Sequence, residues 1–352
     1  METRERMQLI ESIAEEIVIR EELYSLLDSG KKIKAYDGFE PSGLAHLPFA
    51  VYRAITIKKL LKAGVDFTLY LADYFAFVNN KLNGDRDSIH SCGEYFLEVW
   101  KAAGIPLKKI NVVWASKLMD SLEYWDTVLS IARNLTQKRN LRAMMIAGRS
   151  AQEKLTVAQT FYPSMQVADI FMLDVDICQL GLDQRRANIL ARELAPKLGR
   201  KKPVAVHHHM LLGLQGAKEG DAIEGKMSKS KPTSSIFVHD SREEIGQKIK
   251  NAYCPAGEKE NNPLLEYSKH IIFEYFKEVR IERPQKFGGN AEFHSYQELE
   301  EAFVNRKLHP LDLKKAVAFY LNEIIAPIRE HFEKNPKAAK LLENVRMAGN
   351  TR

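Results

Sequence analysis

Apolar residues near the start of the chain recur with the spacing of an amphipathic helix. Ile10, Ile13, Ile17 and Leu23 lie near one helical face within an otherwise charged stretch. The pattern therefore predicts a helical segment over residues 1–30. This stretch lacks the long apolar core of a signal peptide.

The next pattern is a strand, a glycine-containing turn, a helix and a second strand. A short apolar strand is predicted over residues 33–36, and it runs into the turn 37–43. A helical pattern follows from about 47 to 63, and Gly64 is placed to cap its end. Residues 67–72 are again apolar and strand-like. This order predicts a βαβ unit of a parallel sheet, which binds ligands at the carboxyl ends of its strands.

The alternation then repeats, and it changes character in the last third of the chain. Strands are predicted at 110–115, near 177 and at 203–206. One helix is predicted after the first of these strands, up to about residue 148, and another over 184–198. Beyond about 236 the pattern is helical, over 241–254, 263–279, 295–305 and 310–332. We therefore expect an α/β Rossmann-like domain over 31–235 and a mainly helical domain over 236–352.

Composition fits a soluble globular chain and excludes several classes of protein. The 352 residues are 45% hydrophobic and 28% charged, with a net charge of +6. No stretch reaches the roughly 18 apolar residues of a membrane span, so a cytoplasmic protein is expected. The three cysteines form no CxxC pair, which argues against a disulfide scaffold or a cysteine-rich zinc site.

The loop KMSKS, residues 226–230, carries the strongest chemical signal. Lys226 and Lys229 stand three residues apart between Gly225 and Pro232, and glycine and proline favour a loop. Two ammonium groups on a loop suit the binding of nucleotide phosphates while charge builds on a pyrophosphate leaving group. A solvated lysine-rich loop is the alternative for a generic KxxK.

The first βα turn is a candidate phosphate site. Gly38 and Gly43 allow a nucleotide to approach the backbone, and His46 stands where the helix opens. A second cluster, Tyr162, Gln166 and Asp169, has i, i+4, i+7 spacing and so shares one helix face. A partly exposed polar stripe is the alternative for this second cluster.

These motifs resemble those of tyrosyl-tRNA synthetases of the archaeal and eukaryotic type, which are class I aminoacyl-tRNA synthetases. GFEPSG, YPSMQVAD, GLDQR, KMSKS, KFGG and LHPLDLK occur in the family's order along nearly the whole chain. The resemblance implies that Tyr162, Gln166 and Gln184 hold the amino end of tyrosine. It also implies that Tyr36 and Asp169 bind its phenolic hydroxyl.

The resemblance implies a two-step reaction without a protein nucleophile. The carboxylate of L-tyrosine attacks the α-phosphorus of ATP, expelling pyrophosphate as a Mg²⁺ complex, and tyrosine is then transferred to the terminal adenosine of tRNA(Tyr). His46, Lys226 and Lys229 would stabilise the transferring phosphates, with no metal held by the protein itself. The chain departs from the family's HIGH motif, because HLPF at 46–49 lacks the glycine and the second histidine. Pro48 is compatible with the first turn of a helix, although it removes one N–H and adds a ring where the family packs adenine against glycine. Because His46 is retained, an active enzyme is still expected.

Two surfaces are candidates for RNA contact, and the family forms homodimers. The first is a basic stretch over 134–149, which the resemblance places in a connecting insertion at about 100–155. The second is a set of turn residues in the helical domain that would read the anticodon. The candidate residues are Lys138, Arg139 and Arg142 in the first, with Arg149 nearby, and Phe287, His309 and Asp312 in the second. A solvated basic face, and turn and cap residues, are the respective alternatives.

Other readings stay open at this stage. A tryptophan-activating relative would have no use for Tyr36 and Asp169 facing a hydroxyl. An idle paralogue that serves as an RNA-binding scaffold would need neither the lysine loop nor the tyrosine pocket. The run His207, His208 and His209 invites a metal site, but consecutive strand residues point to opposite faces, so a strand end is favoured.

Overall fold

The central element of this computed structural model is a six-stranded sheet, and the structure describes residues 1–144, 155–217, 225–229 and 232–349. The strand order is β1-β6-β5-β2-β3-β4. The five longer strands run parallel, while β1 pairs with β6 in the antiparallel sense. The strands are β1 (Glu16–Ile17), β2 (Ile33–Phe39), β3 (Val65–Leu71), β4 (Asn111–Trp114), β5 (Ile177–Gly181) and β6 (Val204–His208).

The alternation of strands and helices predicted from the sequence is confirmed, with two differences. The segment expected to be one helix up to about residue 148 contains three helices in its described part, which ends at residue 144. The other difference is at the amino end. The segment expected to be helical to residue 30 contains α1 (Thr3–Glu11) and α2 (Arg20–Asp28), separated by β1. Glu16 and Ile17 satisfy their backbone groups against the edge strand β6, which the helical spacing did not reveal. Along the central strands, β3 is buried at all but one position, as expected for a sheet covered on both faces.

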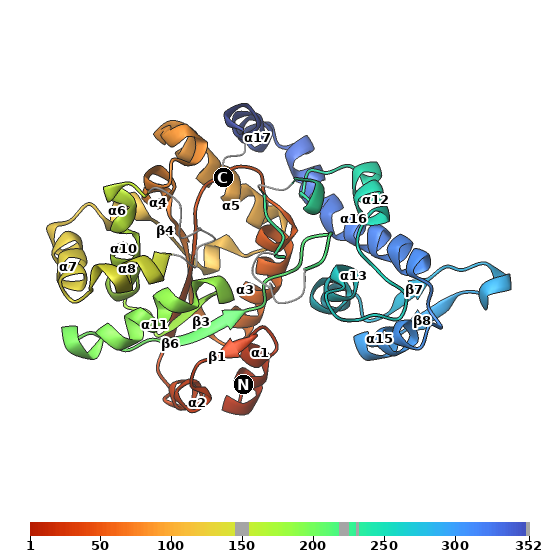
Figure 1. The fold of residues 1–352 in the computed structure, drawn as a ribbon, viewed down its shortest axis with the longest axis horizontal. Helices are drawn as coiled ribbons and strands as arrows, with labels where there is room; N and C mark the ends of the chain where they lie inside the picture. Colours follow the sequence, from red (N-terminus) through yellow and green to blue (C-terminus); the bar gives the residue numbers. More distant parts are fainter. Residues whose placement is uncertain (145–154, 218–224, 230–231, 350–352) are drawn as a thin grey trace.

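Helices surround this sheet on both sides (Figure 1). A π-helical turn, η1 (Pro48–Tyr52), leads into α3 (Arg53–Lys62), so the helix expected over 47–63 is present with an altered first turn. The others are α4 (Asp73–Val78), α5 (Arg86–Ala102), α6 (Ala115–Leu118), α7 (Leu122–Arg133), α8 (Gln137–Met144), α9 (Val157–Thr160), α10 (Tyr162–Met172) and α11 (Arg185–Leu194).

The last third of the chain is mainly helical, but it also contains a small hairpin. Its helices are α12 (Arg242–Lys250), α13 (Pro263–Tyr267), α14 (Phe273–Tyr275), α15 (Tyr296–Val304), α16 (Pro310–Lys334) and α17 (Pro336–Ala348), with the π-turn η7 (Ser268–Ile272) between α13 and α14. The helix expected to reach residue 279 ends earlier, because β7 (Val279–Ile281) pairs with β8 (Ala291–Phe293). The link between these two strands projects from the right end of the molecule (Figure 1).

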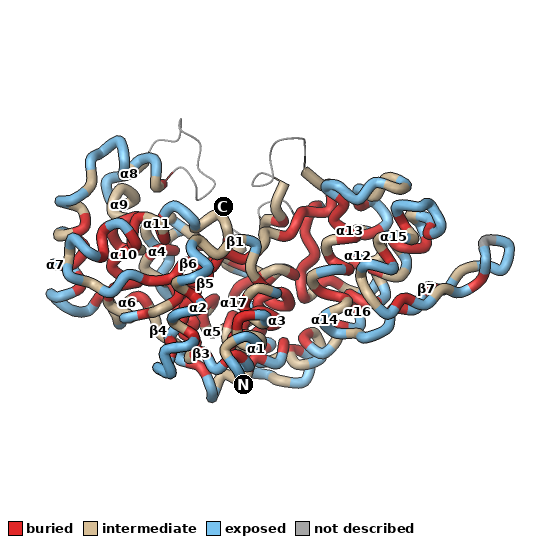
Figure 2. Tube along the Cα trace, turned by 90° about the horizontal axis from the view of Figure 1, so that it is seen from below, coloured by how far each residue is buried: buried red, intermediate tan, exposed pale blue. Residues whose placement is uncertain are grey.

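The two halves share a continuous apolar core. Buried residues of the sheet, α3 and α5 form one cluster with those of α12, α13 and α16, and buried segments occur in both halves (Figure 2). Helix α17 returns to pack on α5, where Asn344 donates a hydrogen bond to Ser91 Oγ at 3.1 Å. In the described residues, no helix has the length and apolar character needed to cross a membrane.

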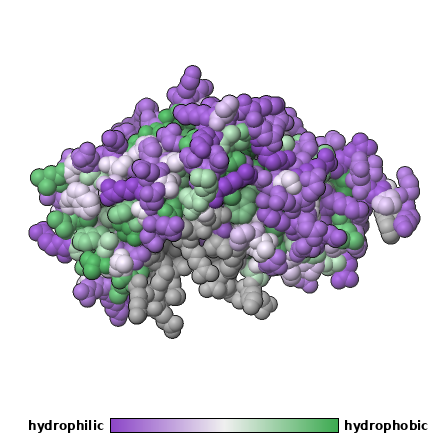
Figure 3. Space-filling view, turned by 90° about the horizontal axis from the view of Figure 1, so that it is seen from above, coloured by the Kyte–Doolittle hydropathy of each residue, from purple (hydrophilic) through white to green (hydrophobic). Residues whose placement is uncertain are grey.

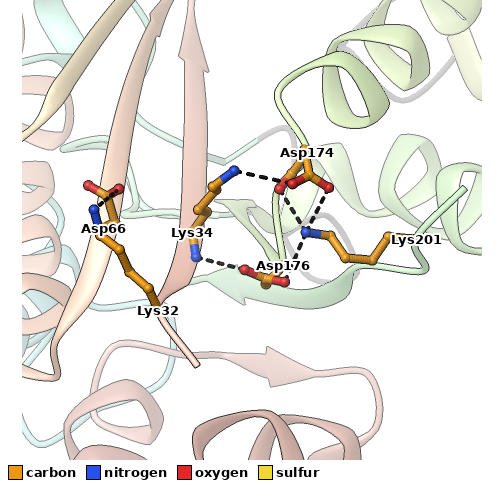
Figure 4. A network of polar contacts seen from close by, with 6 residues as sticks. All are labelled: Lys32, Lys34, Asp66, Asp174, Asp176 and Lys201. Atoms are coloured by element: carbon orange, nitrogen blue, oxygen red, sulfur yellow. Dashed lines mark hydrogen bonds and ion pairs between the residues drawn. The ribbon is translucent and has the colours of Figure 1, made fainter. Parts of the chain in front are cut away.

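Ion pairs join the amino-terminal ends of the strands (Figure 4). Lys201 Nζ lies 2.9 Å from Asp174 and 3.0 Å from Asp176, and the Lys34 backbone N–H donates to Asp176 at 2.8 Å. Lys32 pairs with Asp66 at 2.9 Å. Several of these side chains are exposed, so each pair contributes little to stability, about 0–1 kcal/mol.

Candidate active site

A cavity of about 300 Å³ opens at the carboxyl ends of the parallel strands, where the fold places ligands. Its walls come from the ends of β2, β3, β5 and β6, from α10, and from the loop that carries KMSKS. The predicted site residues that line it are Tyr36, Gly38, His46, Tyr162, Gln166, Asp169 and Gln184.

A buried carboxylate and three tyrosines lie together at one part of this cavity. Tyr70 donates to Asp169 Oδ1 at 2.7 Å, and Tyr124 donates to the same oxygen at 2.9 Å. Burial raises the pKa of Asp169 well above its ordinary value, and the two tyrosine bonds oppose that rise. The Tyr36 hydroxyl is also buried and has no hydrogen-bond partner among the described residues. Buried polar groups are normally paired, so this hydroxyl is available to a ligand.

Sequence reasoning identified Tyr36 and Asp169 but missed Tyr70 and Tyr124. Tyr70 lies on β3, in register with Gly38 of β2, and Tyr124 lies on α7 in the insertion. Neither belongs to a local motif. Their contact with Asp169 depends on strand pairing and on the packing of α7 against α10.

The other predicted tyrosine-pocket residues also come together. Gln166 Nε2 donates to Gln184 Oε1 at 3.1 Å, which joins α10 to the end of β5. Tyr162 donates to Glu40 Oε1 at 2.7 Å, and Asn79 donates to the same oxygen at 2.8 Å. Glu40 was not among the predicted site residues, although it lies within GFEPSG.

His46 is half-buried next to the lysine loop. Its Nδ1 has no hydrogen-bond partner among the described residues. Burial lowers the pKa of His46 well below its ordinary value, and the nearby charges of Lys229 and Lys226 lower it further. His46 is therefore neutral at pH 7. Gly43, three residues earlier, has a φ of +120°, a conformation that favours glycine.

The two lysines of the loop have different surroundings. Lys226 Nζ lies 2.6 Å from Asp183 Oδ2, and both side chains are only partly buried. Lys229 Nζ lies 3.5 Å from Ser42 Oγ, in the turn after β2. Burial lowers the pKa of Lys229 to about 8. The fifth loop residue, Ser230, lies outside the described residues.

A buried polar cluster borders the cavity, and sequence reasoning did not find it. Arg53 Nη2 lies 2.8 Å from Asp37 Oδ2 and donates to Gln179 Oε1 at 2.7 Å. Arg53 Nη1 lies 3.1 Å from His208 Nδ1. Both members of the ion pair are almost fully buried, so each depends on the other for compensation of its charge.

The three consecutive histidines have separate partners. His208 contacts Arg53, whereas His207 Nδ1 lies 2.8 Å from Glu16 and His209 Nε2 lies 3.2 Å from Glu266. The side chains diverge, as strand alternation predicts. Within the described ranges, no group of three or more His, Cys, Asp or Glu residues could hold a metal ion.

The candidate RNA residues lie on three separate elements. Lys138, Arg139 and Arg142 are exposed on α8, where Arg139 forms an ion pair with Glu193; Arg149 lies outside the described residues. In the helical domain, Phe287 ends the 3₁₀ turn η8 (Gln285–Phe287) in the projecting link. The two others begin α16. His309 is exposed and caps this helix, since its Nδ1 accepts from the Leu311 backbone N–H at 3.1 Å, while Asp312 is buried.

Comparisons with known proteins agree with this architecture. Residues 28–326 match the family described as tRNA synthetases class I (W and Y). A tyrosine–tRNA ligase of Saccharolobus islandicus is 44% identical over 98% of this chain and 98% of its own length. Cytoplasmic tyrosine–tRNA ligase 1 of Arabidopsis thaliana is 43% identical, over 98% of this chain and 89% of its own length.

Solved structures show the same similarity. Tyrosyl-tRNA synthetase of Pyrococcus horikoshii, complexed with L-tyrosine, is 39% identical with a TM-score of 0.90, covering 97% of this chain and 100% of that one. A tryptophanyl-tRNA synthetase of Aeropyrum pernix is 17% identical, with a TM-score of 0.67 over 93% of this chain and 84% of its own, a likeness of fold alone.

Proposed function

The chain belongs to the tyrosyl-tRNA synthetases of class I and is a tyrosine–tRNA ligase, and we propose that Tyr36 and Asp169 recognise the phenolic hydroxyl of its substrate. The observation that carries this assignment is the buried Tyr36 hydroxyl, which has no hydrogen-bond partner in the described part of the chain and lines the same cavity as Asp169. Tyr70 and Tyr124 both bond Oδ1 of Asp169, so Oδ2 is the oxygen assigned to the substrate.

The amino end of tyrosine is assigned to the polar residues of α10 and the β5 end. Tyr162, Gln166 and Gln184 line the same cavity, and an ammonium group there would donate hydrogen bonds to the side-chain oxygens of Gln166 and Gln184. Glu40, which accepts from Tyr162, adds a carboxylate on this side. The pocket therefore offers acceptors for the ammonium and a separate polar end for the hydroxyl.

Activation joins the carboxylate of tyrosine to the α-phosphorus of ATP and releases pyrophosphate. We assign the phosphates to the turn containing Gly38 and Gly43, to His46, and to Lys226 and Lys229, which supply hydrogen bonds and positive charge as the pyrophosphate leaves. Mg²⁺ is assigned to the substrate, because this ion binds mainly through nucleotide phosphates. The neutral imidazole of His46 can donate a hydrogen bond without adding charge.

Transfer to tRNA(Tyr) completes the reaction, and the RNA-contacting residues are proposals. The exposed cations Lys138, Arg139 and Arg142 on α8 suit a phosphate backbone. Phe287 and His309 are assigned to the anticodon, since a ring and an imidazole suit unpaired bases. Asp312 belongs to the same proposal, although its burial requires the start of α16 to rearrange for a direct contact.

We also propose a homodimer that uses the outer face of α7. Leu122, Trp125 and Leu129 have i, i+3, i+7 spacing and are 77%, 39% and 56% exposed. Hydrophobic side chains gather at the left end of the surface in Figure 3, the end where Figure 1 places α7. Exposed apolar stripes of this kind mark protein contacts. A cytoplasmic location, as in the name of the Arabidopsis relative, is part of the same proposal.

Tyrosine-dependent ATP–pyrophosphate exchange, run beside tryptophan and phenylalanine, tests the pocket assignment. We expect exchange with tyrosine only. Asp169→Ala should relax the rejection of phenylalanine, and unchanged discrimination in that variant would refute the assignment. Exchange with tryptophan would favour the tryptophan-activating reading. No exchange with any of the three, in a folded protein, would favour an RNA-binding paralogue disabled at HLPF.

A further inference from the structure

The ammonium group of Lys229 lies against two aromatic rings. Its Nζ is 5.0 Å from the ring centroid of Phe49 and 4.6 Å from that of Phe96. The two rings are neighbours, with centroids 4.2 Å apart and planes inclined at 47°. Ser42 Oγ adds a polar contact at 3.5 Å. These distances fall within the range of cation–π attraction.

One of the two rings lies in the segment where this chain departs from the HIGH motif. Phe49 occupies the fourth place of HLPF, where the family's HIGH motif has its second histidine. It lies in the π-turn η1, a local irregularity that is frequent at functional sites. Trp100 stacks on Phe49 at 4.6 Å and its indole N–H donates to the Phe49 carbonyl at 3.1 Å, so the ring has a fixed position.

The chemistry of this contact differs from that of an ion pair. Lys226 is paired with the Asp183 carboxylate, which neutralises its charge and competes with any phosphate. No carboxylate pairs with Lys229 among residues 1–144, 155–217, 225–229 and 232–349. Aromatic rings hold an ammonium group without cancelling its charge, so the full charge stays available to an anion.

We propose that Phe49 and Phe96 form an aromatic seat that positions the Lys229 ammonium for the phosphates of ATP, in place of the second histidine of HIGH. Both are positioning residues, because they act through Lys229. The seat fixes a long, flexible side chain next to the phosphate turn before ATP arrives. The entropy cost of ordering that side chain is then met before the activation step. This inference rests on the proposed role of Lys229.

The test is a double-mutant cycle between Phe49→Leu and Lys229→Met. Phe49→Leu removes the ring and keeps apolar bulk, and Lys229→Met keeps the aliphatic stem without the charge. We expect Phe49→Leu to lower kcat/KM for ATP in pyrophosphate exchange by roughly 3- to 30-fold, with KM for tyrosine unchanged. In the Lys229→Met background the same change should have no further effect, because the ammonium is already gone.

Three variants separate positioning from packing. Phe49→Tyr retains the ring and should retain activity, and Phe96→Leu should repeat the pattern of Phe49→Leu. Phe303→Leu removes a fully buried ring of α15 that belongs to the helical domain and not to the seat, so it should lower the melting temperature with little change in kcat/KM for ATP.

The outcomes are distinct. An equal loss from Phe49→Leu in both backgrounds, or no loss in either, would overturn the seat while leaving the role of Lys229 intact. Unchanged exchange in Lys229→Met alone would overturn the proposed role of Lys229, and the seat with it.

Discussion

Replacing Tyr70 with phenylalanine removes one of the two hydroxyls that donate to Asp169 and leaves the ring in place. Asp169 Oδ1 would then keep only the bond from Tyr124. The carboxyl would be less firmly oriented, and burial would raise its pKa further without the opposing bond from Tyr70. Both changes weaken its ability to accept the substrate hydroxyl through Oδ2.

The expected loss of kcat/KM for tyrosine follows from the type of hydrogen bond that the substitution removes. A hydrogen bond to a charged group contributes about 1.5–3 kcal/mol, and each 1.36 kcal/mol is a factor of ten in rate. Because this bond is also present before tyrosine binds, only part of its free energy affects kcat/KM, and we expect Tyr70→Phe to lower kcat/KM for tyrosine by about three- to tenfold. Phenylalanine has no hydroxyl to bond Asp169, so its kcat/KM should not change. Tyrosyl-tRNA synthetase is known to reject phenylalanine by roughly 10⁵-fold, so most of the discrimination should survive.

Pyrophosphate exchange with each amino acid directly measures the ratio of kcat/KM for tyrosine to kcat/KM for phenylalanine. Tyr320→Phe is a matched control, because it also removes a hydroxyl that makes a hydrogen bond. The Tyr320 hydroxyl accepts from the Arg280 backbone N–H at 2.7 Å, and both residues belong to the helical domain, away from the cavity. It should leave the ratio of the two substrates unchanged. If folded Tyr70→Phe protein discriminates as well as the unmodified chain, the reasoning that Tyr70 orients Asp169 is wrong.

Three further predictions concern pH, stability and assembly. Because burial lowers the pKa of Lys229 to about 8, the ammonium loses its charge as pH rises through that value, so kcat/KM for ATP should fall above about pH 8. Lys229→Arg stays charged and should show no such fall, so an identical pH profile in both proteins would contradict the assignment. Gly93→Ala in α5 would drive a methyl group into the Trp114 ring and should lower the free energy of unfolding by about 1–3 kcal/mol, whereas Gly246→Ala in α12, with open space around it, should raise it by about 0.5–1 kcal/mol; denaturant unfolding of the pair checks both signs. Leu129→Asp should convert a dimer to a monomer in sedimentation experiments, while Val304→Asp, at an exposed site on α15, should not; a dimer that survives Leu129→Asp would exclude this face.

Regular periodicity explains which parts of the fold could be predicted from the sequence. The long central strands and α3 and α16 have clear apolar patterns, and the structure contains them. The strand Glu16–Ile17 has only two residues and lies inside a helix-like pattern, so only its partner β6 reveals it. The strands β7 and β8 have three residues each, and their pairing rather than their composition ends the preceding helix.

The residues of the candidate site also fall into two groups, those that could be predicted from a local motif and those that could not. Residues within local motifs, such as His46, Gln166 and Asp169, could be found because each motif combines unusual side chains at a fixed spacing. Tyr70, Tyr124 and Arg53 could not, because each looks like an ordinary residue of a strand or helix. Their hydrogen-bond partners Asp169, Gln179 and His208 lie 45 to 155 positions away in the sequence.

The two lysines of KMSKS show where sequence reasoning reaches its limit. Lys226 and Lys229 are the same residue type, three positions apart, and the pattern gives them one role. In the structure Lys226 pairs with a carboxylate and Lys229 lies against two rings, so two identical side chains have opposite surroundings. Under the proposed role of the loop, a phosphate would have to displace Asp183 from Lys226, whereas at Lys229 it would meet an ammonium that lies against rings and not against a carboxylate. Lys229 therefore has more to contribute on first contact with ATP, and its replacement should slow activation more than that of Lys226.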